Sequence, residues 1–134
     1  MLYLAHPYWS PDSATRKARV AAVQEAATSI IKLHFLYPLA SLPFSYALDE
    51  AETFGREYWL HYSLRLLQRA DAVLVLPFAG WLESEGLRRE LFVARGLGLS
   101  IYSPAQYRLP LPKEESLHSP AWHGGPEFIE GVNK

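Results

Sequence analysis

The order of apolar segments along this chain predicts a three-layer α/β/α domain built on a parallel sheet of four or five strands. Four short apolar runs alternate with three stretches that have helical periodicity. A strand that follows a strand and a helix in this way is normally parallel to the first strand, with helices on both faces of the sheet. The run "DAVLVLPF" (71–78) also lacks any alternation of polar and apolar residues, which is typical of a strand covered on both faces.

The first half of the chain contains two of the expected strands and one long helix. "LYLA" (2–5) is a short apolar run that ends at His6-Pro7. Pro11 and Asp12-Ser13 mark a helix start, and valine and isoleucine recur at helical spacing up to about residue 33. "FLYP" (35–38) is expected to be the second strand. The stretch 40–55 has no clear period, so we expect an ordered loop there.

The second half repeats the pattern and ends in a tail. Residues 56–69 carry an apolar and aromatic stripe at helical spacing, 71–78 is the buried strand, and 87–97 is helical again. "SIY" (100–102) is expected to be the fourth strand. From about residue 103 the chain is rich in proline and polar residues, which predicts a loop-like tail on a single domain.

Composition excludes several classes of function. The chain has 134 residues, a net charge of −1 and 49% hydrophobic residues, so one folded core is expected and binding to nucleic acid or a membrane through bulk charge is not. No apolar run reaches membrane length, and we expect a cytoplasmic protein. There is no cysteine, and no pair of the five histidines has the helical spacing of a metal site. We therefore expect neither a metal nor a cofactor.

Glu90 is the strongest candidate for a reactive side chain. In a parallel sheet, ligands bind at the carboxyl ends of the strands, and the stretch "GWLESEGLRRE" (80–90) follows one such end. On a helical wheel, Glu90 falls within the apolar arc of the helix 87–97, whereas Arg88 and Arg95 fall outside it. A carboxyl group with apolar neighbours needs a partner or has a raised pKa. A structural alternative, in which Glu90 pairs with an arginine, remains open.

Other residues near the strand ends are candidates for binding a substrate. Gly86 permits close approach of the backbone and Ser84 can cap the helix, so the loop and the helix N-terminus form a site for phosphate or sugar hydroxyls. His6 follows the first strand and could donate a hydrogen bond to a sugar or phosphate oxygen. The full set of expected substrate contacts is His6, Tyr8, Arg16, Gly80, Trp81, Ser84 and Gly86.

Three segments of the chain resemble a known family. "YLAHPYWSPD", "DAVLVLPFAGW" and "SEGLRRELFVARGLG" are similar to DUF1937/DUF4406-type members of the nucleoside 2-deoxyribosyltransferase-like superfamily. The resemblance covers roughly residues 1–102 and implies a flavodoxin-like fold. It also implies that Glu90 is a nucleophile at the anomeric carbon of a sugar and that Tyr3 orients it. Where the enzymes carry an aspartate on the preceding helix, this chain has Ser63.

These features predict an enzyme that acts on an N-glycosidic bond, either a nucleoside or nucleotide deoxyribosyltransferase or an N-glycoside hydrolase. The expected partner is a small nucleoside or nucleotide, and nicotinamide or ADP-ribose compounds remain possible substrates. Two alternatives stay open: a nucleotide-binding or sensing module without turnover, which Ser63 favours, and an interaction protein. The many aromatic residues of the helix 56–69 predict a homo-oligomer.

Overall fold

The computed structural model describes residues 1–49 and 53–109, which fold around a four-stranded sheet in which every pair of neighbours is parallel. The strands are β1 (Leu2–Ala5), β2 (Pro38–Leu39), β3 (Ala72–Val75) and β4 (Ser100–Tyr102), in the order β2-β1-β3-β4. The predicted α/β fold with a parallel sheet is therefore confirmed, with four strands in the described part of the chain.

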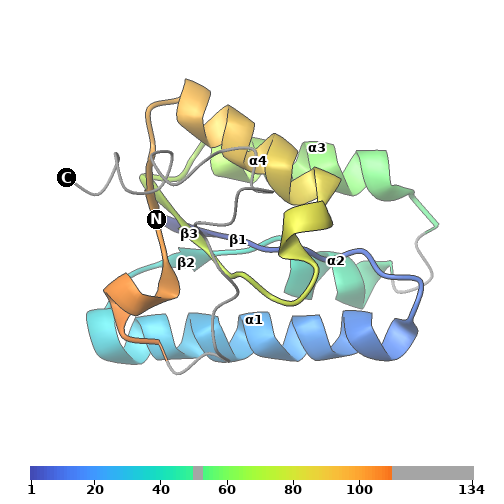
Figure 1. Ribbon diagram of the computed structural model, residues 1–134, viewed down its shortest axis with the longest axis horizontal. Helices are drawn as coiled ribbons and strands as arrows, with labels where there is room; N and C mark the ends of the chain where they lie inside the picture. Colours follow the sequence, from blue (N-terminus) through green and yellow to red (C-terminus); the bar gives the residue numbers. More distant parts are fainter. Residues whose placement is uncertain (50–52, 110–134) are drawn as a thin grey trace.

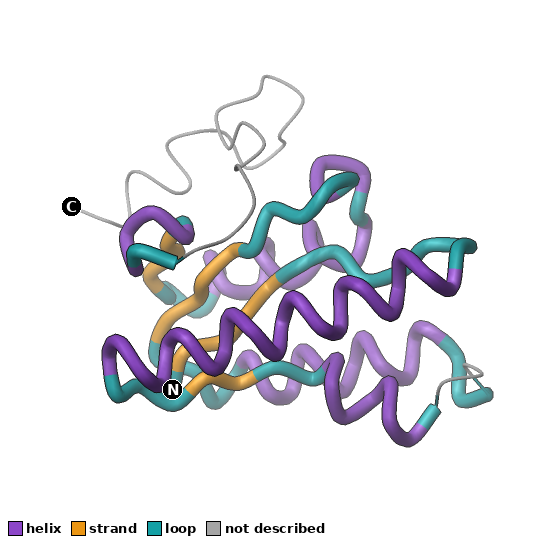
Figure 2. The backbone as a smooth tube through the Cα atoms, turned by 90° about the horizontal axis from the view of Figure 1, so that it is seen from below, coloured by secondary structure: helices purple, strands orange, loops and turns teal. Residues whose placement is uncertain are grey.

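Helices cover both faces of this sheet. α1 (Ser13–His34) lies on one side, and α3 (Arg56–Leu67) and α4 (Glu85–Gly96) lie together on the other (Figure 1). The short helix α2 (Leu42–Leu48) follows β2 and contacts α1. Figure 2 shows α1 running across one face of the strands. The arrangement is the three-layer one that the order of elements predicts.

The alternation of side chains along β1 and β3 divides the core into two clusters, one on each face of the sheet. The cluster on the α1 face includes Leu2, Leu4, Leu74 and Leu76. The cluster on the face of α3 and α4 includes Tyr3, Ala5, Val73 and Val75. All eight residues are buried. A strand buried on both faces needs no polar side chains, which explains the unbroken apolar run in the sequence.

The two ends of α1 are fixed by local interactions. Asp12 is the N-cap, and its carboxylate accepts from the backbone N–H groups of Ala14 and Thr15, both at 3.3 Å. Phe35 ends the helix in a left-handed conformation with φ 55°. The prediction of a strand at 35–38 was therefore wrong in its position. Phe35 still belongs to the helix terminus, so β2 begins only at Pro38.

Residues 40–55 do not form the loop that was expected, because α2 occupies 42–48. Pro43 lies in its first turn, where a proline suits helical geometry. Leu42 is buried in the cluster on the α1 face, with Tyr46 packed against it. Seven residues span only about two turns, which is too short for a clear period in the sequence. Tertiary packing against α1 stabilises this helix.

The remaining boundaries shift by a few residues. α4 begins at Glu85, two residues before the predicted start, and β3 covers only 72–75 of the apolar run 71–78. The predicted tail begins with a short 3-10 turn, Pro104–Tyr107, and its residues 110–134 lie outside the described part of the chain. None of the described helices is long and apolar enough to span a membrane.

The division of the core predicts a large difference between two leucine substitutions. Leu74→Ala removes a side chain with no exposed surface and should lower the free energy of unfolding by about 2–5 kcal/mol. Leu48→Ala changes a side chain that is 60% exposed and should have an effect within about 0.5 kcal/mol. Urea denaturation of both variants checks this, and equal losses would contradict the assignment of Leu74 to the core.

Candidate active site

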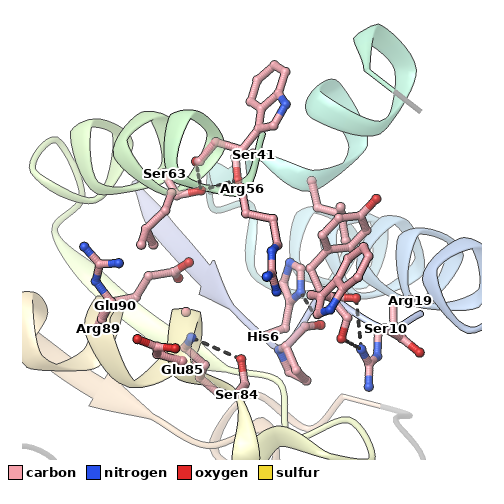
Figure 3. A pocket seen from close by; sticks show the side chains of 18 of the residues that line it. His6, Ser10, Arg19, Ser41, Arg56, Ser63, Ser84, Glu85, Arg89 and Glu90 are labelled. Carbon is pink, nitrogen blue, oxygen red and sulfur yellow. Dashed lines mark hydrogen bonds between the residues drawn. The ribbon is translucent and has the colours of Figure 1, made fainter. Parts of the chain in front are cut away.

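An open pocket of about 720 Å³ lies at the carboxyl ends of the strands. β1 and β3 are neighbours there, but the chain leaves β1 toward β2 and leaves β3 toward β4, on opposite sides. This reversal of direction opens a crevice between the two strand-end loops. The loops after β1 and β3 line the pocket, together with residues from α2, α3 and α4 (Figure 3). Its size is that of a site for a small organic molecule.

Glu90 extends from α4 into this pocket (Figure 3). The residue is 9% exposed, and its Oε2 atom has no hydrogen-bond partner among the described residues. Burial raises the pKa of the carboxyl group to about 8, and a hydrogen-bonding interaction with Tyr3 lowers it in part. The helical wheel therefore placed Glu90 correctly on the buried face. The structural alternative is not supported, because the ion pairs within 1–49 and 53–109 do not include Glu90.

Tyr3 brings its hydroxyl to Glu90 from β1, as expected from the resemblance, and lies beneath the pocket without lining it. Burial raises the pKa of this hydroxyl well above its usual value, and the charge of Glu90 raises it further. Ser63 and Ser41 lie beside the same hydroxyl. Their Oγ atoms are 2.6 Å apart, and Ser63 Oγ also donates to the Trp59 carbonyl at 3.0 Å. Ser63 therefore lies at the site, where its side chain supplies a hydroxyl in place of the carboxyl group of an aspartate.

His6 lines the pocket, but its protonation differs from the expected one. Its Nδ1 atom is 3.1 Å from the Pro7 carbonyl oxygen. Because a carbonyl oxygen only accepts, Nδ1 carries the proton. Burial lowers the pKa of His6 to about 4, with a further decrease from the charge of Arg19. The ring is therefore neutral at pH 7 and its Nε2 atom is an acceptor. This tautomer does not support the expectation that His6 donates to a ligand oxygen, and Nε2 can accept from a sugar hydroxyl instead.

One wall of the pocket is formed by Gly80, Glu83, Ser84, Glu85 and Gly86. Ser84 is the N-cap of α4, and its Oγ accepts from the Leu87 N–H at 3.2 Å. A Cβ atom on Gly86 would meet no protein atom within 4 Å, so the backbone is open to a ligand there. Trp81, however, has no exposed surface and packs in the core. The expectation that Trp81 contacts a substrate was wrong, because its indole anchors this loop from below.

Two arginines of α1, the expected contact Arg16 and the nearby Arg19, have different roles. Arg19 donates to the carbonyl oxygens of Tyr8 and Trp9, both at 2.9 Å, and to that of Ala79 at 2.7 Å. It therefore joins the loop after β1 to the loop after β3. Arg16 donates to the Ser10 carbonyl and does not line the pocket. The expectation that Arg16 contacts the substrate is therefore not supported. Tyr8 does line the pocket, as expected.

The pocket also contains contacts between aromatic and charged residues that the sequence did not reveal. Trp9 is 43% exposed, and two guanidinium groups contact its ring, Arg56 at 4.8 Å and Arg16 at 5.2 Å from the ring centroid. Arg89 forms an ion pair with Glu57 at 3.0 Å. Arg56, Glu57 and Arg89 all line the pocket. They come from two different helices, so no sequence spacing marks them as neighbours.

Asp49 stabilises the side of the pocket that α2 and α3 form. It accepts from the N–H groups of Thr53 and Phe54 and from Nε1 of Trp59, the last at 2.8 Å. Burial acts to raise the pKa of Asp49, but these hydrogen bonds outweigh burial and lower it. The carboxylate thereby holds the start of α3 against the end of α2. Within the described residues, no group of three His, Asp or Glu side chains is arranged to hold a metal ion.

Comparison with known proteins gives the family but no activity. The family model of DUF1937, a domain of unknown function, matches residues 1–104. The chain belongs to this family, and the match spans the sheet and every helix described above. A search of curated proteins found no match.

The buried carboxyl group predicts a pH-dependent stability difference. An unfolded glutamate has a pKa near 4.3, whereas that of Glu90 in the fold is about 8. Between these values the folded state binds a proton that the unfolded state has lost, so the free energy of unfolding falls as pH rises. Glu90→Gln should remove this slope, on the order of 1.4 kcal/mol per pH unit. The pKa of His6 lies below its usual value, so His6 makes the free energy of unfolding rise with pH. This contribution is the same in wild type and in Glu90→Gln.

Denaturation of wild type and Glu90→Gln from pH 5 to pH 9 measures the difference. The variant should gain stability over wild type as pH rises, and the gain should level off above about pH 8. Glu85→Gln is the matched control, because Glu85 is exposed on the same helix. Parallel pH profiles for wild type and Glu90→Gln would show that Glu90 titrates normally.

Proposed function

We propose that this protein cleaves or transfers an N-glycosidic bond, with Glu90 as the nucleophile at the anomeric carbon. The observation that carries the proposal is the Glu90 carboxyl group itself, which is buried, faces a pocket of small-molecule size and has an oxygen without a hydrogen-bond partner among the described residues. A carboxyl group whose pKa is strongly shifted and that faces a pocket is a candidate for chemistry. The expected substrate is a nucleoside or nucleotide.

In the first step, a Glu90 oxygen forms a bond to the anomeric carbon while the bond to the base nitrogen breaks through an oxocarbenium-like transition state. Tyr3 holds the carboxylate in place through its hydroxyl. The positive charge that develops on the sugar stabilises the ionised form of Glu90 in its apolar surroundings. Water or a second base then attacks the same carbon and releases Glu90. His6 Nε2 and the backbone near Gly86 supply contacts for sugar hydroxyls.

A nucleotide-binding module without turnover is the second candidate, and one observation favours it. Ser63 stands where the related enzymes carry an aspartate, and its hydroxyl donates to a backbone carbonyl within α3. A hydroxyl group is too weak an acid to protonate a departing base. Product chromatography of nucleosides, nucleotides and NAD separates the two candidates, because only the enzyme releases a free base. A thermal-shift screen with the same compounds detects binding without turnover.

Substitution of the nucleophile should abolish turnover without loss of folding. Glu90→Gln keeps the size of the side chain but cannot attack, so kcat should fall at least about a thousand-fold. Glu83→Gln is the matched control, because Glu83 lines the same pocket but is exposed, and it should keep most of the activity. Base release under single-turnover conditions gives the rates. Equal losses in both variants would contradict the role of Glu90.

The rate should rise with pH. Attack needs ionised Glu90, whose pKa is raised to about 8 by burial, so kcat/KM should increase about tenfold per unit below pH 8 and level off above it. The profile of the free enzyme is measured with the substrate that the screen identifies. A rate that is constant from pH 6 to pH 9 would show that the ionisation of Glu90 does not limit the reaction.

Two further expectations from the sequence stay predictions. A chain of ring contacts runs along α2 and α3 through Phe44, Tyr62, Trp59, Tyr58 and Phe54. Phe44, Phe54 and Tyr58 are more than half exposed, so this surface is a candidate interface of the expected homo-oligomer. Sedimentation at micromolar concentration tests it. The cytoplasmic location likewise stays a prediction.

A further inference from the structure

The two sides of the pocket differ in charge and in their ability to transfer a proton. Glu90 enters from α4, and Arg56 reaches from α3 toward His6 on the other side (Figure 3). A nucleophile attacks the anomeric carbon from the face opposite the bond that breaks, so the departing heterocycle must lie away from Glu90. With Glu90 as nucleophile, the leaving group therefore lies beside Arg56 and the ring of Trp9, which is 4.8 Å from the Arg56 guanidinium.

His6, Arg56, Asp49 and Glu57 on this leaving-group side do not supply a proton near pH 7. His6 is neutral and its Nδ1 proton is held by the Pro7 carbonyl. Ser63 has a hydroxyl group, and Arg56 does not lose its proton in proteins. Asp49 is ionised and accepts three hydrogen bonds. Glu57 is paired with Arg89.

The remaining described carboxyl groups of the pocket lie with the nucleophile. Glu83 precedes α4 and Glu85 is its first residue, and both side chains line the pocket and are exposed. Figure 3 shows Glu85 beside Glu90 and Arg89, away from Arg56. Apart from Asp49 and Glu57, the described carboxyl groups that line the pocket are therefore on the attacking side, where the leaving group does not lie.

A permanent cation and an aromatic face can still assist a leaving group. The Trp9 ring stacks on a planar heterocycle, and a guanidinium stabilises negative charge on its ring atoms. Arg56 forms no ion pair with another residue of the ranges 1–49 and 53–109. Arg16 also contacts Trp9, which adds a second positive charge there. Next to the Trp9 ring, these two guanidinium groups favour an anion and repel a cation.

We propose that the pocket takes N-glycosides whose heterocycle departs as an anion, and that Arg56 determines this specificity. The proposal rests on the proposed function. Its substrate class is the glycosides of acidic heterocycles, such as pyrimidinediones of the uracil type. Glycosides of a cationic pyridinium, such as nicotinamide riboside, are excluded by repulsion from Arg56. Adenine glycosides are poor substrates, because adenine needs a proton to depart.

The reaction balances without a further reagent. A Glu90 oxygen bonds to the anomeric carbon while the C–N bond breaks, and its electron pair leaves on the heterocycle nitrogen as an anion beside Arg56. A water oxygen then bonds to the same carbon, and the electron pair of the ester C–O bond returns to Glu90. One water proton neutralises the heterocycle, and the other stays on the new sugar hydroxyl.

The test compares leaving groups on one sugar. Rates of base release are measured for uracil, 5-fluorouracil, adenine and nicotinamide glycosides, as ribosides, deoxyribosides and their 5′-phosphates. Wild type should cleave the uracil compound at least about ten times faster than the adenine one, and 5-fluorouracil should leave faster than uracil. Faster cleavage of adenine or nicotinamide glycosides would overturn the inference and leave the proposed function standing. If wild type cleaves none of these compounds, the proposed function fails and this inference fails with it.

Variants of Arg56 separate specificity from folding. Arg56→Gln should lower kcat/KM for the uracil glycoside about a hundred-fold and should raise the relative rate of the nicotinamide glycoside, which a loss of structure would not do. Arg56→Lys should keep the preference for acidic heterocycles. Arg65→Gln is the matched control, because Arg65 is exposed on the same helix and does not line the pocket. An unchanged leaving-group preference in Arg56→Gln would overturn the role of Arg56.

Discussion

The burial of one carboxyl group beneath an open pocket is the constraint on which the site depends. Glu90 lies on the apolar face of α4, where a charged group without a partner is costly. Tyr3 reaches it because β1 pairs with β3 in parallel, with Tyr3 opposite Val73. The order of strands therefore fixes the distance between two residues that lie 87 positions apart in the chain. A ligand that brings positive charge to this carboxyl group gains more there than it would in water.

The pocket joins two halves of different chemistry. On one side, α4 and the segment before it contribute three glutamates and Arg89. On the other, α2, α3 and the loop after β1 contribute aromatic rings, hydroxyls and guanidinium groups, and the carboxylates of Asp49 and Glu57 lie there as well. Asp49 keeps the second half in place by tying the start of α3 to α2. The family match covers residues 1–104 and so includes both halves.

Much of the fold could be predicted from the sequence, because buried parallel strands and amphipathic helices leave a strong periodic signal. Glu90 was found by the same signal, as a polar residue at an apolar position. α2 was missed because a helix of two turns gives no clear period in the sequence. The residues that α2 places near the pocket were therefore missed as well. Arg56 and Trp9 were not recognised as neighbours, since only the folded chain brings them together. Trp81 was misplaced because an aromatic residue in a loop looks the same whether it faces a ligand or the core.

The Arg19 guanidinium has a consequence for how this site can change. All of its hydrogen bonds to the two strand-end loops go to backbone carbonyl oxygens. The contacts of Arg19 therefore do not depend on which side chains stand at positions 8, 9 and 79. Substitutions of Tyr8 and Trp9, which line the pocket, can alter its shape and polarity while the contacts of Arg19 stay in place. The scaffold is consequently suited to acquiring new ligands through changes in its loops, both in evolution and in the laboratory.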